Sequence, residues 1–279
     1  MNVRLRLAHA TVQYIAQEAG IDLLHIKGYS VSPGLYRPQR ASSDVDVLVR
    51  PGSEDALVSA LLTHGWRLET TFDTGSLFRH AAALWDDRFG HLDVHRSFPG
   101  ITISAEAAFA TLWDRAQSRS ICHVECRTLN RIDHATLITL HAGRDGARGR
   151  ADIEHLRATL DAAEFTAVHA RAHELGADVA QSAALGTLQH HHNEPSYHLW
   201  RALASDANRV DLFLARYRDA GDLTERIRVL ASVIRVNRDH LAMSLGYRPR
   251  WRDIWNEHVA RTRAVLTYRR HHRNRKAGR

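Results

Sequence analysis

The hydrophobic pattern of the first 130 residues alternates between helical and strand-like stretches. A helix is predicted near the start, where apolar residues approximate helical spacing at Leu7, Val12, Ile15 and Ala16. It is expected to end at Gly20, because glycine commonly closes a helix. A short apolar run over residues 22–26 follows and is ended by Lys27 and Gly28. The chain therefore begins with a helix that leads into a strand and a glycine turn.

The other patterns in this half predict a small sheet with helices packed on it. A helix that ends at Gly65 is predicted from the apolar positions Leu57, Leu61 and Leu62. Strand-like runs between Asp, Gly and Pro turns lie at residues 44–49, 66–71, 77–85, 91–98 and 122–129. A further helix is predicted near residues 104–116. Together these elements predict a mixed sheet of about five strands.

The second half of the chain has a different pattern. Helical spacing continues almost throughout from Arg131 to Leu266, with breaks at residues 143–149 and 191–195. The predicted fold class is α+β, and no internal repeat is found. We predict an α/β domain, a helical domain and a disordered basic tail, over residues 1–130, 131–268 and 269–279 respectively.

The formal charge of +7 lies mainly in the C-terminal tail. The chain has 38 Lys and Arg against 31 Asp and Glu, and six of the basic residues fall in 269–279, where there is no acid. Since 7 − 6 leaves +1 for residues 1–268, the body is unlike a dedicated nucleic-acid binder, which is basic over its surface. Nucleic acid or anionic lipid could bind through the tail, although a solvated end explains it more simply. All but two of the basic residues are arginine, the exceptions being Lys27 and Lys276.

Cysteine content and hydropathy favour a cytoplasmic protein. Cys122 and Cys126 cannot build a disulfide framework, and we interpret them as two buried residues on one face of a strand. No stretch approaches 18 apolar residues, and no signal-like apolar run begins the chain. We therefore expect no membrane span.

Three carboxylates form the strongest candidate for chemistry. Asp44 and Asp46 are two residues apart in a strand-like run, so they point to the same face of the strand. Asp93 lies in a second alternating run. If the two strands are neighbours, three carboxylates come together, and such a set can hold two Mg²⁺ ions for phosphoryl or nucleotidyl transfer. An Asp-x-Asp pair alone is also common as a solvated structural feature.

The order of these motifs resembles a known family. The chain is similar to the "uncharacterised nucleotidyltransferase" family of the DNA polymerase β superfamily. The resemblance covers about residues 22–97 and is carried by Ile26-Lys27-Gly28, Leu35-Tyr36, Arg40, Asp44-Val45-Asp46-Val47-Leu48-Val49 and Leu92-Asp93-Val94-His95. The helical remainder agrees only in character. The resemblance implies a small mixed sheet with a helical C-terminal domain that closes over the cleft.

The resemblance also implies roles for individual residues. Asp44 and Asp46 would ligate Mg²⁺, and Asp93 would supply the third carboxylate and help to deprotonate the attacking hydroxyl. Gly28 matches the glycine where the chain approaches the nucleotide phosphates. The best-studied members of the superfamily have Gly-Ser at this point, whereas this chain has Gly28-Tyr29. The group that contacts the phosphates is therefore less certain than the metal ligands.

Two cations and a serine complete the predicted nucleotide site. Lys27 offers a compact charge and Arg40 a planar fork, and both suit a triphosphate. Ser43 directly precedes the acidic pair and is included as a nucleotide-binding candidate. Either cation could instead be an ordinary surface residue.

Other clusters have simpler interpretations. His91, Asp93 and His95 alternate on one strand and could hold a transition metal, or His95 could orient Asp93. The run His190–His192 is interpreted as a solvated turn. The glycine-broken segment with Arg144, Arg148 and Arg150, near Asp145, Asp152 and Glu154, could contact phosphate or form an ordinary helix start. Three tryptophans are interpreted as helix-packing residues: Trp200, Trp251 and Trp255.

These observations predict a Mg²⁺-dependent nucleotidyltransferase. It would move a nucleoside monophosphate from an NTP, with ATP preferred, to a hydroxyl or phosphate on a small-molecule or peptide acceptor. Two alternatives stay open: a nucleotide-binding module without turnover, and an RNA-directed transferase that uses the basic tail. The sequence identifies neither the acceptor nor the oligomeric state.

Overall fold

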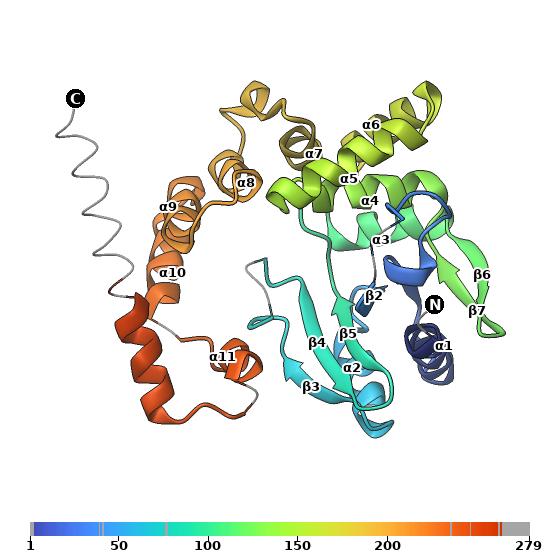
Figure 1. Ribbon diagram of the computed structural model, residues 1–279, viewed down its shortest axis with the longest axis horizontal. Helices are drawn as coiled ribbons and strands as arrows, with labels where there is room; N and C mark the ends of the chain where they lie inside the picture. The colour runs from blue at the N-terminus through green and yellow to red at the C-terminus, as the bar shows by residue number, and fades with distance from the viewer. Residues whose placement is uncertain are drawn as a thin grey trace.

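The chain folds into a mixed sheet with helices on both faces and a helical region beyond it (Figure 1). The computed structural model describes residues 3–38, 40, 42–75, 78–234, 236–245, 247–261 and 263. The predicted tail and Leu77, at the start of one predicted strand, lie outside the described residues. The predicted α+β class is confirmed.

The sheet consists of strands β1 (Leu23–His25), β2 (Asp44–Val49), β3 (Arg67–Thr70), β4 (Ala81–Asp86), β5 (Gly90–His95), β6 (Gln117–Ile121) and β7 (Val124–Thr128). Three helices accompany it: α1 (Val3–Glu18), α2 (Glu54–Thr63) and α3 (Ala105–Asp114). The helical region comprises α4 (Arg131–Ala142), α5 (Gly146–Thr159), α6 (Ala162–Glu174), α7 (Asp178–Leu185), α8 (Tyr197–Ala204), α9 (Arg209–Asp219), α10 (Leu223–Ile234) and α11 (Arg238–Leu245). Two single turns of 3-10 helix are η1 (Gly28–Ser30) and η2 (Leu188–His191). Residues 251–261 are also helical.

The strand order is β3-β4-β5-β2-β1-β7-β6, so the prediction of about five strands was wrong. β2 runs parallel to β5 and antiparallel to β1. β6 was missed because its residues, Gln117–Ile121, are mostly polar and exposed, as at the edge of a sheet. The strand expected over 122–129 begins two residues later, since Cys122 and His123 form the hairpin turn with positive φ angles.

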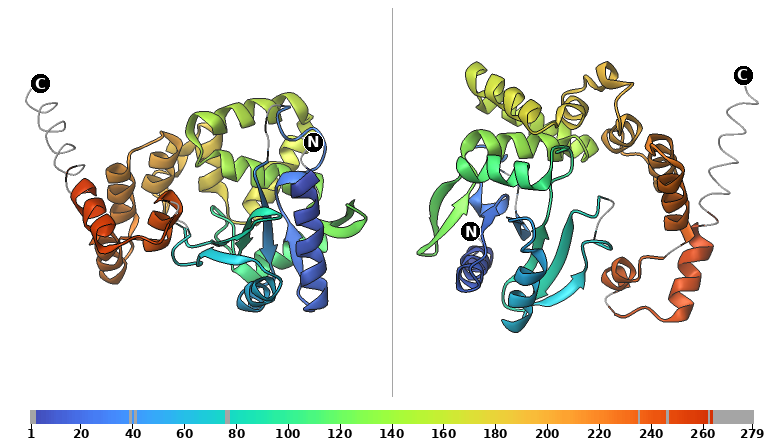
Figure 2. Two further views of the ribbon diagram at one scale, coloured as in Figure 1. Left: turned by 60° about the horizontal axis from the view of Figure 1, so that its bottom comes forward. Right: turned by 180° about the vertical axis from the view of Figure 1, so that it is seen from behind.

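Helices α1 and α2 cover one face of the sheet through an apolar cluster that includes Val12, Leu57 and Val47. A second cluster joins strand residues such as Leu24 and Leu48 to α3, α4, α7 and α8. Figure 2 shows these two layers from other sides. The second cluster draws on residues before and after 130, and the predicted division into domains at that point stays a prediction.

Some packing predictions were wrong in detail. Leu7 is 44% exposed, because the buried stripe of α1 runs through Leu5, Ala8, Val12 and Ile15 instead. Trp200 is buried as predicted, but Trp251 and Trp255 are 72% and 64% exposed. Cys126 is buried in β7, whereas Cys122 is only half-buried because it lies in the turn. Within the described residues, none of the helices is long and apolar enough to cross a bilayer.

Several histidines are buried, and their burial predicts a loss of stability in acid. Burial, with Arg119 nearby, lowers the pKa of His134 to about 3, and burial lowers the pKa of His9 to about 4. An unfolded histidine titrates near 6.5, so the stability from each neutral imidazole is complete above that pH and is lost as the pH falls toward the folded pKa. The loss reaches about 2 kcal/mol per histidine at pH 5.

His134→Gln should therefore make the decline of unfolding free energy between pH 7 and pH 5 shallower by about 2 kcal/mol. Urea unfolding at each pH measures this quantity. His192→Gln is the matched control, because His192 is exposed and should leave the decline unchanged. An identical decline in His134→Gln and the parent would contradict the prediction.

Candidate functional site

The three predicted carboxylates come from two neighbouring parallel strands. Asp46 is only 1% exposed, and it pairs in register with Asp93 of β5. Asp44 pairs with His91 two positions earlier. Because side chains alternate along a strand, Asp44 and Asp46 share a face, while the alternating valines Val45, Val47 and Val49 enter the cluster under α1 and α2. The register therefore gathers these acidic side chains at one end of β2.

The carboxylate of Asp46 is held by two partners. Lys27 Nζ lies 2.6 Å from Asp46 Oδ1, and His95 Nε2 donates to the same oxygen at 2.8 Å. Burial would raise the pKa of Asp46, but the Lys27 charge and the His95 hydrogen bond outweigh it and hold this pKa far below its usual range. Asp46 is therefore an anion. The expectation that His95 orients Asp93 was wrong, because His95 bonds to Asp46.

The other two carboxylates lack such compensation. Burial, followed by the charge of Asp46, raises the pKa of Asp93 to about 7. The same two causes raise the pKa of Asp44. Like charges in a partly buried site repel each other, and a divalent cation between them removes this penalty. The arrangement therefore fits a hard metal ion with oxygen ligands.

The potential ligand atoms that lie closest together belong to Asp46, Asp93 and His95, all within 4.8 Å of one another. His91 is not in this group. Its Nδ1 lies 3.2 Å from Glu69, and its ring packs against Trp85. The alternative site made of His91, Asp93 and His95 is therefore not formed, whereas metal ligation by Asp44, Asp46 and Asp93 stays a prediction.

The turn at Gly28 requires glycine. Gly28 has a φ of +69°, which side chains strongly disfavour. A Cβ there would lie 3.0 Å from Ser42 Oγ, 3.2 Å from His9 Nε2 and 3.3 Å from the Asp44 carbonyl oxygen. The turn is therefore pressed against the start of β2. The possible helix after Gly28 is only the single turn η1.

Edge strand β6 supports this turn from outside. Arg119 Nη1 donates to the carbonyl oxygens of Ser30 and Val31 at 3.1 and 2.8 Å. Ser30 Oγ in turn donates to the Lys27 carbonyl at 2.7 Å. These bonds lock the η1 segment, and the sequence did not reveal Arg119 because β6 itself was missed.

The two remaining predicted nucleotide residues, Arg40 and Ser43, have different surroundings. Arg40 stacks on Tyr36, with Cζ 4.3 Å from the ring centre, and forms an ion pair with Asp152 of α5. Arg37 binds the other oxygen of Asp152 at 2.7 Å. Ser43 is exposed, and its hydroxyl donates to Asp44 Oδ1 at 3.3 Å. Ser43 therefore contacts the acidic cluster, and Arg40 contacts the helical region.

The helical region also supplies Arg144, which the sequence marked only as one of three arginines in a glycine-broken segment that could contact phosphate. Arg144 lies between α4 and α5, and it interacts electrostatically with Asp46 and Asp93. Its Cζ lies 6.0 Å from the centre of the Phe98 ring. The only sequence signal was the glycine-broken, arginine-rich stretch around it.

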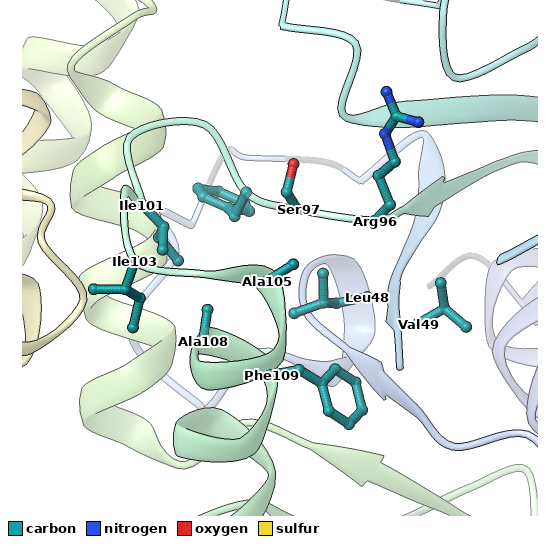
Figure 3. Close-up of a pocket in the computed structure, with 10 residues that line it drawn as sticks. Leu48, Val49, Arg96, Ser97, Ile101, Ile103, Ala105, Ala108 and Phe109 are labelled. Atoms are coloured by element: carbon teal, nitrogen blue, oxygen red, sulfur yellow. The ribbon is translucent and has the colours of Figure 1, made fainter. Parts of the chain in front are cut away.

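A small apolar pocket of about 50 Å³ lies beside the end of β2 (Figure 3). Leu48 and Phe109 line it together with Ile101, Ile103 and Ala108. None of the three carboxylates borders this pocket. This apolar pocket beside α3 is therefore not a candidate reaction site.

Comparisons with known proteins identify the family of the chain. Residues 2–193 match the family described as "Uncharacterised nucleotidyltransferase". This is more than half of the chain, and the chain belongs to that family. A comparison with curated proteins gives no significant match.

Similar solved structures include the lincosamide antibiotic adenylyltransferase LnuA, at 16% identity and a TM-score of 0.37, over 56% of this chain and 96% of that one. The antibiotic-resistance factor ANT(2'')-Ia has 15% identity and a TM-score of 0.37, over 69% of this chain and 99% of that one. An antigenic nucleotidyltransferase-like protein from Paracoccidioides brasiliensis has 13% identity and a TM-score of 0.38, over 66% and 93% of the two chains. Because these TM-scores are low, the family assignment rests on the family match.

The Gly28 turn can be tested against a matched glycine. Gly20 has a similar φ of +65°, but a Cβ there would meet nothing within 4 Å. Gly20→Ala should lower the unfolding free energy by about 1 kcal/mol through backbone strain alone. Gly28→Ala should lower it further, because Ser42, His9 and the Asp44 backbone must also move. Denaturant titration of both variants measures the difference in unfolding free energy. Equal losses in the two variants would contradict the predicted crowding at Gly28.

Proposed function

We propose that the protein is a cytoplasmic nucleotidyltransferase that moves a nucleoside monophosphate from an NTP to an acceptor and releases pyrophosphate. The observation that carries this proposal is the pairing of Asp46 with Asp93 on parallel strands beside the Lys27-Gly28 turn. Membership of the nucleotidyltransferase family supports the reaction class. ATP is the proposed donor.

Asp44, Asp46 and Asp93 would hold Mg²⁺, with two ions expected. Bound there, the metal would supply charge neutralisation for the phosphates and a lower pKa for the acceptor hydroxyl. Lys27 stabilises the Asp46 anion at 2.6 Å, so it keeps one ligand deprotonated. Asp93, with a pKa near neutrality, can take the proton of the attacking hydroxyl at its carboxylate. The Gly28 turn places backbone close to the metal ligands, where phosphates would lie.

The proposed acceptor is a small molecule or a peptide. The charge of residues 1–268 is only +1, which is too low for a surface that tracks a nucleic-acid backbone. All three carboxylates of the predicted set are present on β2 and β5, which argues against a module without turnover. These two points favour a small-molecule transferase over an RNA-directed enzyme and over a module without turnover.

Loss of the metal ligands should abolish the activity. Asp44→Asn together with Asp46→Asn should lower the rate of pyrophosphate release by about a thousandfold or more, because metal charge stabilisation contributes several kcal/mol. Asp44→Asn alone is the gentler variant, since Asp44 is half-buried and its side chain accepts only from Ser43 in the part of the chain described. Asp73→Asn, at an exposed carboxylate, is the control. Undiminished turnover in the double variant would exclude the mechanism.

The donor and the acceptor can be found by mass spectrometry. Each NTP is incubated with Mg²⁺ and candidate hydroxyl-bearing small molecules and peptides, and products are searched for the mass of an added nucleoside monophosphate. We expect an adduct with at least one acceptor and with ATP. Tight NTP binding by calorimetry without adduct or pyrophosphate would instead support the non-catalytic module. Salt-sensitive RNA binding by residues 1–268 would support the RNA-directed enzyme.

Lys27 is predicted to act through Asp46. Lys27→Ala removes the charge that lowers the Asp46 pKa, so metal affinity should fall most at acid pH, where Asp46 would begin to take up a proton. Mg²⁺ titration of the parent and the variant at pH 6 and pH 8 measures this. Arg50→Ala, which removes an exposed pair with Asp22, is the control. A variant with parental Mg²⁺ affinity and turnover at both pH values would show that Lys27 is only a surface cation.

A further inference from the structure

Arg144 differs from the other cations near the site. Lys27 is bound to Asp46, and Arg40 is bound to Asp152. Arg144 is only partly exposed, and within the described residues its side chain has no hydrogen bond or ion pair, only its approach to the Phe98 ring and longer-range electrostatic interactions. A guanidinium has five N–H donors, and a partly buried one normally finds acceptors. The donors of Arg144 are thus available to a ligand.

The packing of the α4–α5 corner sets the position of Arg144. A Cβ at Gly143 would lie 2.6 Å from the Ala180 carbonyl oxygen of α7. At Gly146 a Cβ would overlap the side chain of Asp206, and at Gly149 it would overlap the backbone of Ala142. Three glycines therefore allow the corner to pack this closely against its neighbours. Arg144 lies within this corner, next to Gly143.

An ionic clamp fixes the helix that follows Arg144. Asp152 of α5 is buried and receives both Arg37 and Arg40, which follow the Gly28 turn in the chain. Because Asp152 takes up Arg40, that arginine is not available to a phosphate without breaking this pair. The clamp instead ties the segment after the nucleotide turn to α5. Arg144 approaches the site through Phe98, whose ring centre lies 6.0 Å from Arg144 Cζ and 6.3 Å from the ring centre of His95, the partner of Asp46.

The charges of the carboxylates and of Arg144 indicate which kind of ligand would bind between them. Asp46 and Asp93 lie in register on neighbouring strands, with ligand atoms within 4.8 Å, so their charges favour a cation between them, whereas the side-chain donors of Arg144 favour an acceptor with negative charge. A polyphosphate with bound divalent metal provides both at once, because its oxygens accept from a guanidinium while the metal meets the carboxylates. We propose that Arg144, supplied by the helical region, binds the phosphate chain that leaves as pyrophosphate. This inference rests on the proposed nucleotidyl transfer.

Binding of pyrophosphate to the full-length protein tests Arg144 without turnover. Calorimetry with Mg²⁺ and inorganic pyrophosphate should show about ten- to hundredfold weaker binding for Arg144→Gln than for the parent, as expected for losing charged hydrogen bonds to phosphate. Arg144→Lys should show an intermediate loss, since it keeps the charge without the fork. Arg148→Ala is the matched control, because Arg148 is exposed on the same segment and should bind like the parent.

The outcomes separate this inference from the proposed function. Equal pyrophosphate affinity in the parent, Arg144→Lys and Arg144→Gln would overturn the assignment of Arg144, even if the parent transfers nucleotides. An affinity that depends on Arg144 in a protein without turnover would support the phosphate site and overturn only the transferase reaction. Melting curves show whether Arg144→Gln has folded. If it has not, Arg144→Lys decides the test. A pyrophosphate affinity of Arg144→Lys equal to that of the parent counts against the inference, and a lower affinity supports it.

Discussion

The buried carboxylate of Asp46 is the interaction on which the rest of the site depends. A carboxylate removed from water is strongly destabilising unless its charge is compensated, and here Lys27 and His95 both contact one of its oxygens. These partners come from the ends of β1 and β5, on either side of β2. One anion therefore holds three adjacent strands in a common arrangement. A lysine stands at position 27 of a chain whose other cations are arginine with a single exception, and its compact ammonium shares one Asp46 oxygen with His95.

Because Lys27 is paired with Asp46, its charge is largely balanced there, and the three carboxylates together carry more negative charge than this one cation compensates. Burial and the nearby charge of Asp46 raise the pKa of both Asp44 and Asp93. Under the proposed function, a phosphate chain entering this space would need positive charge from outside the sheet. Arg144 of the helical region would supply it, which would give that region a part in the chemistry.

The sequence was most informative where the candidate functional residues lie within one short run that also has a clear strand pattern. The run from Asp44 to Val49 identified a strand, its apolar face and its acidic face at once. From the sequence, the neighbouring position of the Asp93 strand was only a condition for a three-carboxylate site, and the structure shows that the two strands pair in parallel. The sequence was uninformative where a tertiary contact gives a residue its role. Arg119 sits in a polar edge strand without hydrophobic periodicity, and Arg144 lies among arginines that differ only in what they face.

Arg40 shows why residue type and motif position do not suffice to assign a role. It follows the Gly28 turn and precedes the acidic pair, so its place in the motif favours a phosphate contact. Asp152, more than a hundred residues later, instead takes up its charge together with that of Arg37. Releasing Arg40 to a ligand would remove one of the two arginines that pair with the buried Asp152 and would weaken the attachment of α5. Under the proposed function, Arg40 would therefore stay bound to Asp152, and the phosphate would bind Arg144, whose side chain has no ion pair to break within the described residues.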